Sequence, residues 1–283
     1  MTRSIRLANW TGKSCVFYVV DDFLAALSIT GANTKTLQRE REKARAALCA
    51  AKHVFAITDV LNERLHKGYG ISPTTLGLAL EPEPKLTTPP KKQIIYLGSI
   101  NFLYTQGLRD LFSAVQRIRQ NVEPDLTVRL TVPPEVATRE LGMALPPFVV
   151  SSPIESSQAL AREIASSLFA FLPYSFDRRE EGMVATSFPS KSLEYFAYAR
   201  SIVVYGPEYG VATRIFRKAG LPSVVSSLSE LEGMVRLHLA TWPEHSILYR
   251  KHLAESHSLA AARNTICASL GLTNCSRDAS RGA

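Results

Sequence analysis

Short apolar runs alternate with helical segments along most of the 283 residues, and this alternation is the strongest constraint on the fold. Parallel strands need a long crossover between them, and that crossover is usually a helix. The alternation therefore predicts an α/β protein with parallel sheets covered by helices on both faces. Strands are expected at residues 15–20, 53–57, 93–97, 126–132, 147–150, 168–172, 201–205 and 222–225, with a further strand-like piece that ends at Leu80.

The helices between these runs are expected from apolar spacing and from residues that favour helix ends. The clearest spacing is that of Leu108, Leu111, Phe112, Val115 and Ile118. Other helices are expected at 36–51, 59–67, 190–200 and 208–219, with Gly68 and Gly220 ending two of them.

Residues 81–92, EPEPKLTTPPKK, are rich in proline and charge and lack apolar periodicity. This composition is typical of a linker between domains, although a long surface loop within one domain is the alternative. Only about three strands precede the linker, whereas about six follow it. We therefore predict a partial N-terminal Rossmann-like domain at 1–82, a complete doubly wound domain at 83–241, a helical segment at 242–272 and a disordered tail at 273–283.

The composition describes a globular protein, with 46% hydrophobic and 20% charged residues. A formal net charge of +8 indicates phosphate-bearing partners or an acidic membrane surface. The alternative is that the excess only aids solubility, because the basic residues are scattered rather than striped. A nucleic acid is not among the expected partners.

The four cysteines show neither metal-ligand spacing nor the spacing of a small disulfide framework. They are expected to be reduced, mostly buried thiols. No run has the length of a signal peptide core or of a membrane span. The protein is therefore expected in the cytoplasm, either soluble or at the periphery of a membrane.

Residues at the carboxyl ends of the strands of 83–241 are the best candidates for a ligand site, because open parallel sheets bind ligands there. Gly98 and Ser99 follow the first strand, and a bare backbone lets a phosphate or sugar approach closely. Ser190 is expected to cap a helix whose free amides attract an anion. Lys191 would neutralise a bound diphosphate, and Glu194 would bind the ribose hydroxyls. On spacing alone, an exposed ion pair between Lys191 and Glu194 is the simpler interpretation.

Other polar residues are weaker candidates. Asp21 and Asp22 end a strand and either bind an acceptor hydroxyl or cap the next segment. His53 begins an apolar strand and is expected to be structural. The remaining candidates lack metal spacing and are expected at the surface: His238, His245, His252 and His257.

Two runs joined by a long loop resemble the donor-binding domain of GT-B fold glycosyltransferases, in particular the group-1, family-4-like class. They are LFAFLPYSFD and FPSKSLEYFAYARSIVVYGPEYG. IIYLGSINFLYTQGLRDLFSAV is similar to the first strand, glycine loop and helix of the same domain. VFYVVDDF and HVFAITDVLNERLHKGYG resemble later strands of the acceptor domain. The resemblance covers about residues 14–226 and is most specific at 187–210.

The resemblance implies two Rossmann-like domains and a nucleoside-diphosphate sugar as the donor. Glu194 then matches the ribose-binding glutamate, Lys191 lies by the diphosphate, and Gly98 belongs to the phosphate loop. Ser99, Ser190 and Tyr195 complete the implied donor-binding set. The implied reaction is transfer of a sugar to a saccharide or lipid-linked acceptor in cell-surface polysaccharide synthesis. Neither a metal nor another cofactor is implied, and no catalytic residue is assigned.

The chain departs from that family at several positions. Thr186 stands where the family has the first glutamate of its pair, and Ser99 and Gln106 replace basic residues near the first loop. The front of the acceptor domain and its glycine-rich loop have no counterpart in this sequence. Two alternatives therefore stand beside a transferase: a non-catalytic nucleotide-binding relic or subunit that needs a partner, and an epimerase-like enzyme of the same fold.

Overall fold

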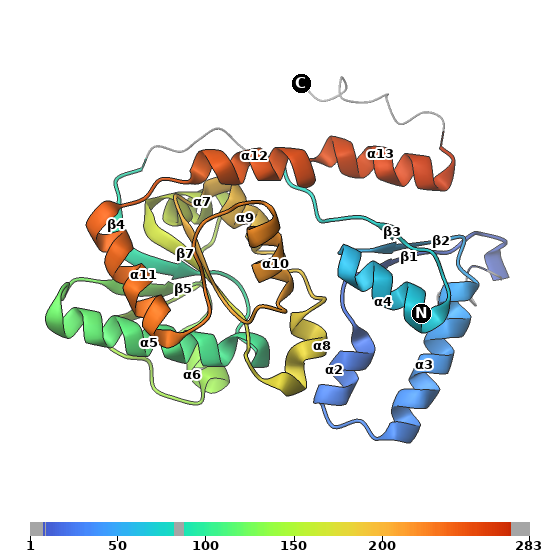
Figure 1. Ribbon diagram of the computed structural model, residues 1–283, viewed down its shortest axis with the longest axis horizontal. Helices are drawn as coiled ribbons and strands as arrows, with labels where there is room; N and C mark the ends of the chain where they lie inside the picture. Colours follow the sequence, from blue (N-terminus) through green and yellow to red (C-terminus); the bar gives the residue numbers. More distant parts are fainter. Residues whose placement is uncertain (1–7, 9, 82–87, 273–283) are drawn as a thin grey trace. The chain divides into compact units, whose positions relative to one another are not determined.

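The computed structural model describes residues 8, 10–81 and 88–272, so the predicted tail at 273–283 lies outside the described residues. The chain divides into two compact units (Figure 1). The first takes the described residues of Met1–Glu81, Ala185–Phe188 and Ser256–Ala283, and the second those of Pro82–Val184 and Pro189–Glu255. The residues of the predicted helical segment 242–272 divide between the two units at Glu255 and Ser256.

The first unit contains a three-stranded parallel sheet with the order β1-β2-β3. Asp22 begins α2 by accepting hydrogen bonds from the amides of Leu24 and Ala25. Gly70, with a φ of +70°, ends α4, whereas the predicted stop at Gly68 lies inside that helix. The elements of this unit are β1 (Val16–Val19), α2 (Phe23–Ile29), α3 (Thr34–Cys49), β2 (His53–Ala56), α4 (Asp59–Tyr69), β3 (Thr74–Thr75) and α13 (Leu259–Leu270).

The second unit contains a six-stranded parallel sheet with the order β6-β5-β4-β7-β8-β9. Its strands are β4 (Lys91–Tyr96), β5 (Thr127–Leu130), β6 (Val149–Ser151), β7 (Ser167–Pro173), β8 (Ile202–Tyr205) and β9 (Val224–Val225). In chain order within this unit, the sheet reads 3-2-1-4-5-6, which is the strand order of a doubly wound Rossmann fold. The predicted α/β class with one complete doubly wound unit and one partial unit is confirmed.

Helices cover both faces of the six-stranded sheet (Figure 1). The helices of the second unit are α5 (Phe102–Asn121), α6 (Pro134–Leu141), α7 (Ser157–Ser166), the 3-10 helix η1 (Arg178–Glu180), α8 (Glu181–Val184), α9 (Ser192–Tyr198), α10 (Val211–Lys218), α11 (Leu228–Thr241) and α12 (Ser246–Ser256). The predicted helix at 190–200 is shorter at both ends, and the helix expected at 208–219 begins later, at Val211.

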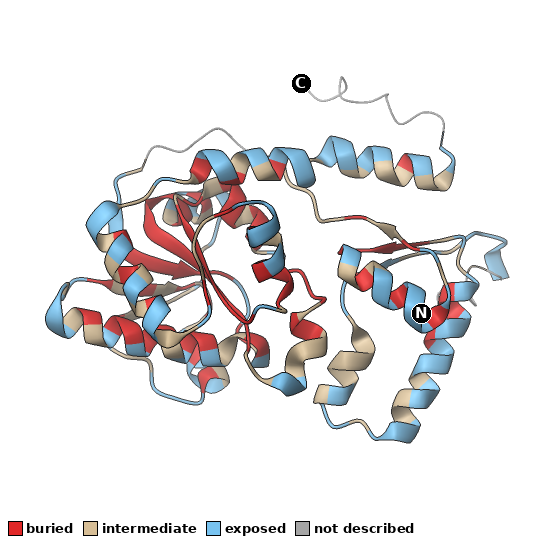
Figure 2. Ribbon diagram, viewed as in Figure 1, coloured by how far each residue is buried: buried red, intermediate tan, exposed pale blue. Residues whose placement is uncertain are grey.

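The strands of the second unit could be predicted from apolar runs because they are buried. All seven residues of β7 and all four of β8 are buried, as the red centre of the sheet in Figure 2 shows. The apolar face of α5 packs on this sheet through the five residues with helical spacing, all of them buried. At Gly107 the backbone of α5 lies so close to β7 that an added Cβ would be 2.5 Å from the Cβ of Pro173.

Three expectations about side chains outside the candidate site are wrong. His257, expected at the surface, is buried, and its Nδ1 lies 2.8 Å from the carbonyl of Leu78. His238 is only 1% exposed: its Nε2 lies 2.8 Å from the hydroxyl of Ser201, and its Nδ1 lies 2.8 Å from the carbonyl of Met234. Cys267 is disulfide-bonded, whereas Cys15 and Cys49 are free. Among the described residues, no helix combines the length and the apolar character that crossing a bilayer requires.

Candidate functional site

The strand order of the second unit changes direction between β4 and β7, and this is the point where doubly wound sheets bind ligands. Two segments with predicted site residues meet beside the end of β4. One is the loop of Gly98 and Ser99, which are both exposed, and the other is the start of α9 with Lys191 and Glu194. The structure thus brings together residues that lie about 90 positions apart in the chain.

Lys191 is the N-cap residue of α9, but its side chain caps nothing. The side chain instead runs to the end of β4, where its amine donates a 2.7 Å hydrogen bond to the phenolic oxygen of Tyr96. The amine also lies 4.0 Å from the ring centroid of Tyr96 and 3.9 Å from that of Tyr104. Two aromatic faces therefore stabilise the charged form of the amine.

Burial among these rings works in the opposite direction and lowers the pKa of Lys191 to about 7. The negative charge of Glu194 raises this pKa but does not outweigh burial. Burial also raises the pKa of Tyr96 well above its ordinary value, so its phenol keeps its proton and donates it to the carbonyl of Ser99 at 2.7 Å. Near neutral pH the amine of Lys191 is therefore only partly protonated, and a bound anion would favour its protonated form.

The loop after β4 offers backbone donors next to this amine. Gly98 has a φ of +78°, and an added Cβ would lie 3.9 Å from the Cε of Lys191. The amide of Gly98 donates to the hydroxyl of Thr131 at 3.0 Å. Within the described part of the chain, the amides of the next two residues, Ser99 and Ile100, have no acceptor. A phosphate oxygen would satisfy such amides.

Glu194 lies on the first turn of α9, and one of its carboxylate oxygens, Oε2, is buried without a partner. Burial raises the pKa of Glu194, while a hydrogen bond to its own backbone and the charge of Lys191 lower it in part. Lys191 and Glu194 form no ion pair, and both side chains are half-buried. The interpretation as an exposed ion pair is therefore wrong. A buried oxygen without a partner is costly unless a ligand hydroxyl donates to it.

Two of the predicted donor-binding residues have other roles. Tyr195 is fully buried, where its hydroxyl accepts from the amide of Leu97 at 2.8 Å and donates to the carbonyl of Phe171 at 3.3 Å. It fixes α9 to the ends of β4 and β7 and does not face a ligand. Ser190 is exposed, and Lys191 rather than Ser190 occupies the N-cap position. The predicted helix cap is therefore wrong.

Sequence reasoning missed the residues that surround the amine. Tyr96 is the last residue of β4, and Tyr104 lies in the first turn of α5. An aromatic residue at the carboxyl end of a strand, beside a predicted ligand loop, was the available signal for Tyr96. Nothing in the spacing distinguished Tyr104 from a core residue.

Asp22, the other acidic candidate, is a structural residue in the first unit. Besides capping α2, its carboxylate pairs with Arg64 at 2.7 Å. His53, as expected, is structural: its Nε2 lies 3.0 Å from the hydroxyl of Thr74. Among the described residues, no group of three or more side chains is arranged to hold a metal ion.

A large open hollow of about 570 Å³ lies elsewhere in the second unit, between α5, the end of α6 and the segment after β7. Its lining includes Thr105, Arg109, Glu140 and Glu180, and none of the predicted donor-binding residues. Volume alone would therefore point to a different place from the one defined by Lys191 and Glu194. We favour the latter because an aromatic-lined amine, free amides and a carboxyl oxygen without a partner lie there together.

No protein-family model and no curated protein sequence matches this chain. Solved structures do match it. TarM has a TM-score of 0.64 and 8% identity over 91% of this chain and 50% of TarM. A trehalose-phosphate synthase from Burkholderia vietnamiensis has a TM-score of 0.64 and 14% identity over 94% of this chain and 71% of that one. A sucrose-phosphate synthase from Thermosynechococcus elongatus has a TM-score of 0.59 and 13% identity over 88% of this chain and 65% of that one.

These structures are GT-B glycosyltransferases, so the chain has the GT-B type of α/β fold that its motifs indicated. The chain spans about half of the length of TarM. At 8–14% identity, the likeness establishes the fold and leaves the activity to be argued from the site.

Proposed function

We propose that this protein is a glycosyltransferase that moves a sugar from a nucleoside-diphosphate donor to a saccharide or lipid-linked acceptor. The observation that carries the proposal is the meeting of Lys191 and Glu194 at the end of β4. One supplies an amine able to gain charge, and the other supplies a buried carboxyl oxygen without a partner. A sugar nucleotide carries the two groups that these side chains lack, a diphosphate and ribose hydroxyls.

The reaction breaks the bond between the sugar's anomeric carbon and the diphosphate, while an acceptor hydroxyl attacks that carbon. Negative charge grows on the departing diphosphate, and stabilising it is the largest contribution that such a site makes. The protonated amine of Lys191 and the free amides of Ser99 and Ile100 would supply that stabilisation. Glu194 would position the nucleoside by accepting hydrogen bonds from the ribose.

A role in cell-surface polysaccharide synthesis, in the cytoplasm or at a membrane surface, is the finer part of the proposal. The sequence resemblance and the net charge of +8 support it, since an anionic lipid surface attracts a basic protein. One matching structure, a mutant of S. aureus TarM, is a complex with α-GlcNAc-glycerol and UDP. The UDP of that complex supports uridine nucleotides as the first donor class to try.

The proposal is tested by incubating the protein with radiolabelled sugar nucleotides of uridine, guanosine and thymidine, each with a panel of saccharide and lipid-linked acceptors. We expect labelled product with one donor, and loss of that product in Lys191→Met and in Glu194→Ala. Lys218→Met removes an exposed lysine of the same unit and should retain activity. Nucleotide binding without transfer to any acceptor would contradict the enzyme and leave a binding subunit.

A further inference from the structure

A hollow of about 330 Å³ lies on the α7 side of the six-stranded sheet, near the edge strand β6. Its lining comes from the three neighbouring strands β4, β5 and β6, from the segment after β6 and from α7, and includes none of the proposed donor-binding residues. Six of the lining residues matter here: Gln93, Arg129, Val150, Ser152, Ile154 and Glu163. Arg129 lies mid-strand on β5, paired with Ile95 on one side and Val150 on the other.

One nitrogen of the Arg129 guanidinium, Nη1, is shielded from solvent and has no hydrogen-bond partner. The side chain as a whole is half-buried, and within the described chain it forms no ion pair. Buried guanidinium groups ordinarily pair with carboxylates or phosphates, because an unpaired buried charge is costly. An oxyanion of a ligand would supply the missing acceptor.

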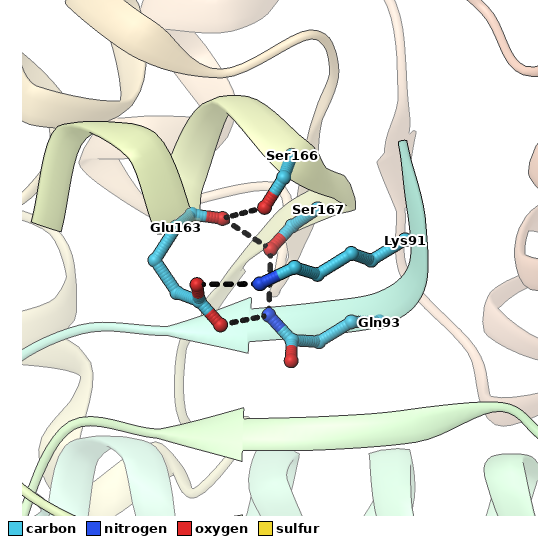
Figure 3. Close-up of polar contacts among 5 residues, drawn as sticks. All are labelled: Lys91, Gln93, Glu163, Ser166 and Ser167. Carbon is cyan, nitrogen blue, oxygen red and sulfur yellow. Dashed lines mark hydrogen bonds and ion pairs between the residues drawn. The ribbon is translucent and has the colours of Figure 1, made fainter. Parts of the chain in front are cut away.

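Glu163 is the one acidic residue that lines the hollow, and its hydrogen bonds go to other residues (Figure 3). Its carboxylate accepts from the amine of Lys91 at 2.8 Å and from the side-chain amide of Gln93 at 2.9 Å. The hydroxyls of Ser166 and Ser167 donate to its backbone carbonyl at 3.1 and 2.7 Å. Figure 3 also shows the side-chain amide of Gln93 donating to the hydroxyl of Ser167 at 3.1 Å, which links the two ends of this network.

The charges of this network leave a positive surplus. Burial raises the pKa of Glu163, but the hydrogen bonds from Lys91 and Gln93, with the charges of Lys91 and Arg129, outweigh it and hold the pKa below its ordinary value. Glu163 is therefore ionised near neutral pH, and Lys91 balances its charge. The single negative charge of Glu163 is thus shared between two positive charges, those of Lys91 and Arg129.

We propose that this hollow is a second ligand site, for a small organic anion whose phosphate or carboxylate group pairs with Arg129. The hydroxyl of Ser152 lies in the lining as a further donor, and Val150 and Ile154 offer apolar walls for the body of the ligand. Val150 is 50% exposed, so this wall is open to an incoming molecule. The site stands apart from the donor site and does not depend on the proposed transferase activity.

The test measures the thermal unfolding midpoint of Lys191→Met, which lacks the other amine expected to bind anions. Sodium phosphate and sodium butyrate are titrated separately, with sodium chloride at equal ionic strength as the reference. A ligand that binds only the folded state raises the midpoint by mass action. We expect phosphate, butyrate or both to raise it beyond chloride, and the more effective salt identifies the oxyanion class. Equal effects of all three salts would overturn the proposal.

Variants locate the effect. In the Lys191→Met background, Arg129→Met should abolish the anion-specific shift, whereas Arg162→Met, an exposed arginine of α7 without an ion pair, should keep it. Glu163→Gln should increase the affinity several-fold, because it removes the negative charge that shares the hollow. This second variant keeps the test decisive if Arg129→Met fails to fold. An unchanged affinity in Glu163→Gln, or an anion shift that survives in Arg129→Met, would contradict the site.

A final arm separates the two sites. Arg129→Met in the otherwise natural chain should bind nucleoside diphosphates as tightly as the parent. A tenfold or larger loss of nucleotide affinity would show that Arg129 belongs to the donor site and would overturn the proposal of a separate one.

Discussion

The amine of Lys191 lies 2.7 Å from the phenolic oxygen of Tyr96, and the same phenol donates to the carbonyl of Ser99 at 2.7 Å. A single buried tyrosine thus connects the start of α9 to the loop after β4. These two hydrogen bonds, which we call the Tyr96 relay, fix the position of the amine beside the free amides of that loop. A lysine at the start of a helix is unfavourable by itself, and this contact explains why the helix tolerates it.

Tyr96→Phe should lower the free energy of unfolding by about 1–3 kcal/mol, because it removes the acceptor for the amine and leaves the carbonyl of Ser99 without its donor. Tyr209→Phe is the matched control, since the Tyr209 hydroxyl is buried without a partner, and its removal should be neutral or stabilising. Urea unfolding of both variants checks this. Equal losses in the two variants would show that the relay contributes no stability.

The depressed pKa of Lys191 makes stability depend on pH. The folded state loses the lysine proton near pH 7, whereas the unfolded chain holds it up to about 10.5. Between these values the unfolded state binds more protons, so raising the pH favours the folded state. Relative to Lys191→Met, the parent should gain at most about 1.4 kcal/mol per pH unit from pH 7 to 9. A difference between the two proteins that does not change with pH would mean that the amine stays charged.

His238 should make the second unit sensitive to acid. Burial lowers the pKa of His238 to about 4, although a hydrogen bond to the backbone of Met234 opposes this. The carbonyl of Met234 can only accept, so in the neutral ring Nδ1 carries the proton and Nε2 accepts from Ser201.

Below about pH 6.5 the unfolded histidine gains a proton that the folded one refuses, so stability falls as the pH drops from 6.5 towards 4. His238→Gln should show a shallower fall over this range in denaturant titrations. Parallel pH profiles of the variant and the parent would contradict the assignment.

Gly107 should be intolerant of any side chain. Its added Cβ would lie 2.5 Å from the Cβ of Pro173, so α5 must move away from the sheet. We expect Gly107→Ala to lower the free energy of unfolding by about 1–3 kcal/mol, the usual cost of overpacking a core. Gly233→Ala in α11 has open space around it and should instead stabilise by roughly 0.5–1 kcal/mol. Thermal unfolding of the pair measures both signs.

Much of the fold could be predicted because the strands of the second unit are buried on both faces. Runs such as 168–172 and 202–205 are apolar throughout, as is typical of strands buried on both faces of a sheet. The end of α4 was harder, since Gly68 and Gly70 both follow the apolar pattern and only the left-handed backbone of Gly70 decides between them. The return of residues 185–188 to the first unit is a tertiary property without a local signal.

The candidate site was partly predictable for the same reason. Gly98, Lys191 and Glu194 follow strand ends, and the topology brings such ends together. Tyr195 belongs to the same motif, yet its hydroxyl points into the core, which spacing cannot reveal. Arg129 was missed entirely, because one arginine within an alternating strand has the pattern of a solvent-facing residue.

Isothermal titration of uridine, guanosine and thymidine diphosphates at pH 6.5 tests the donor site most directly, because Lys191 is then largely protonated. We expect one nucleotide to bind the parent and Lys218→Met equally, and to bind Lys191→Met about tenfold to a hundredfold more weakly, as befits loss of one charge-assisted hydrogen bond. Lys191→Arg should keep its affinity at pH 8.5, where the parent loses it. If none of the three nucleotides binds, or if Lys191→Met binds as tightly as the parent, the donor site does not lie where Lys191 meets Tyr96.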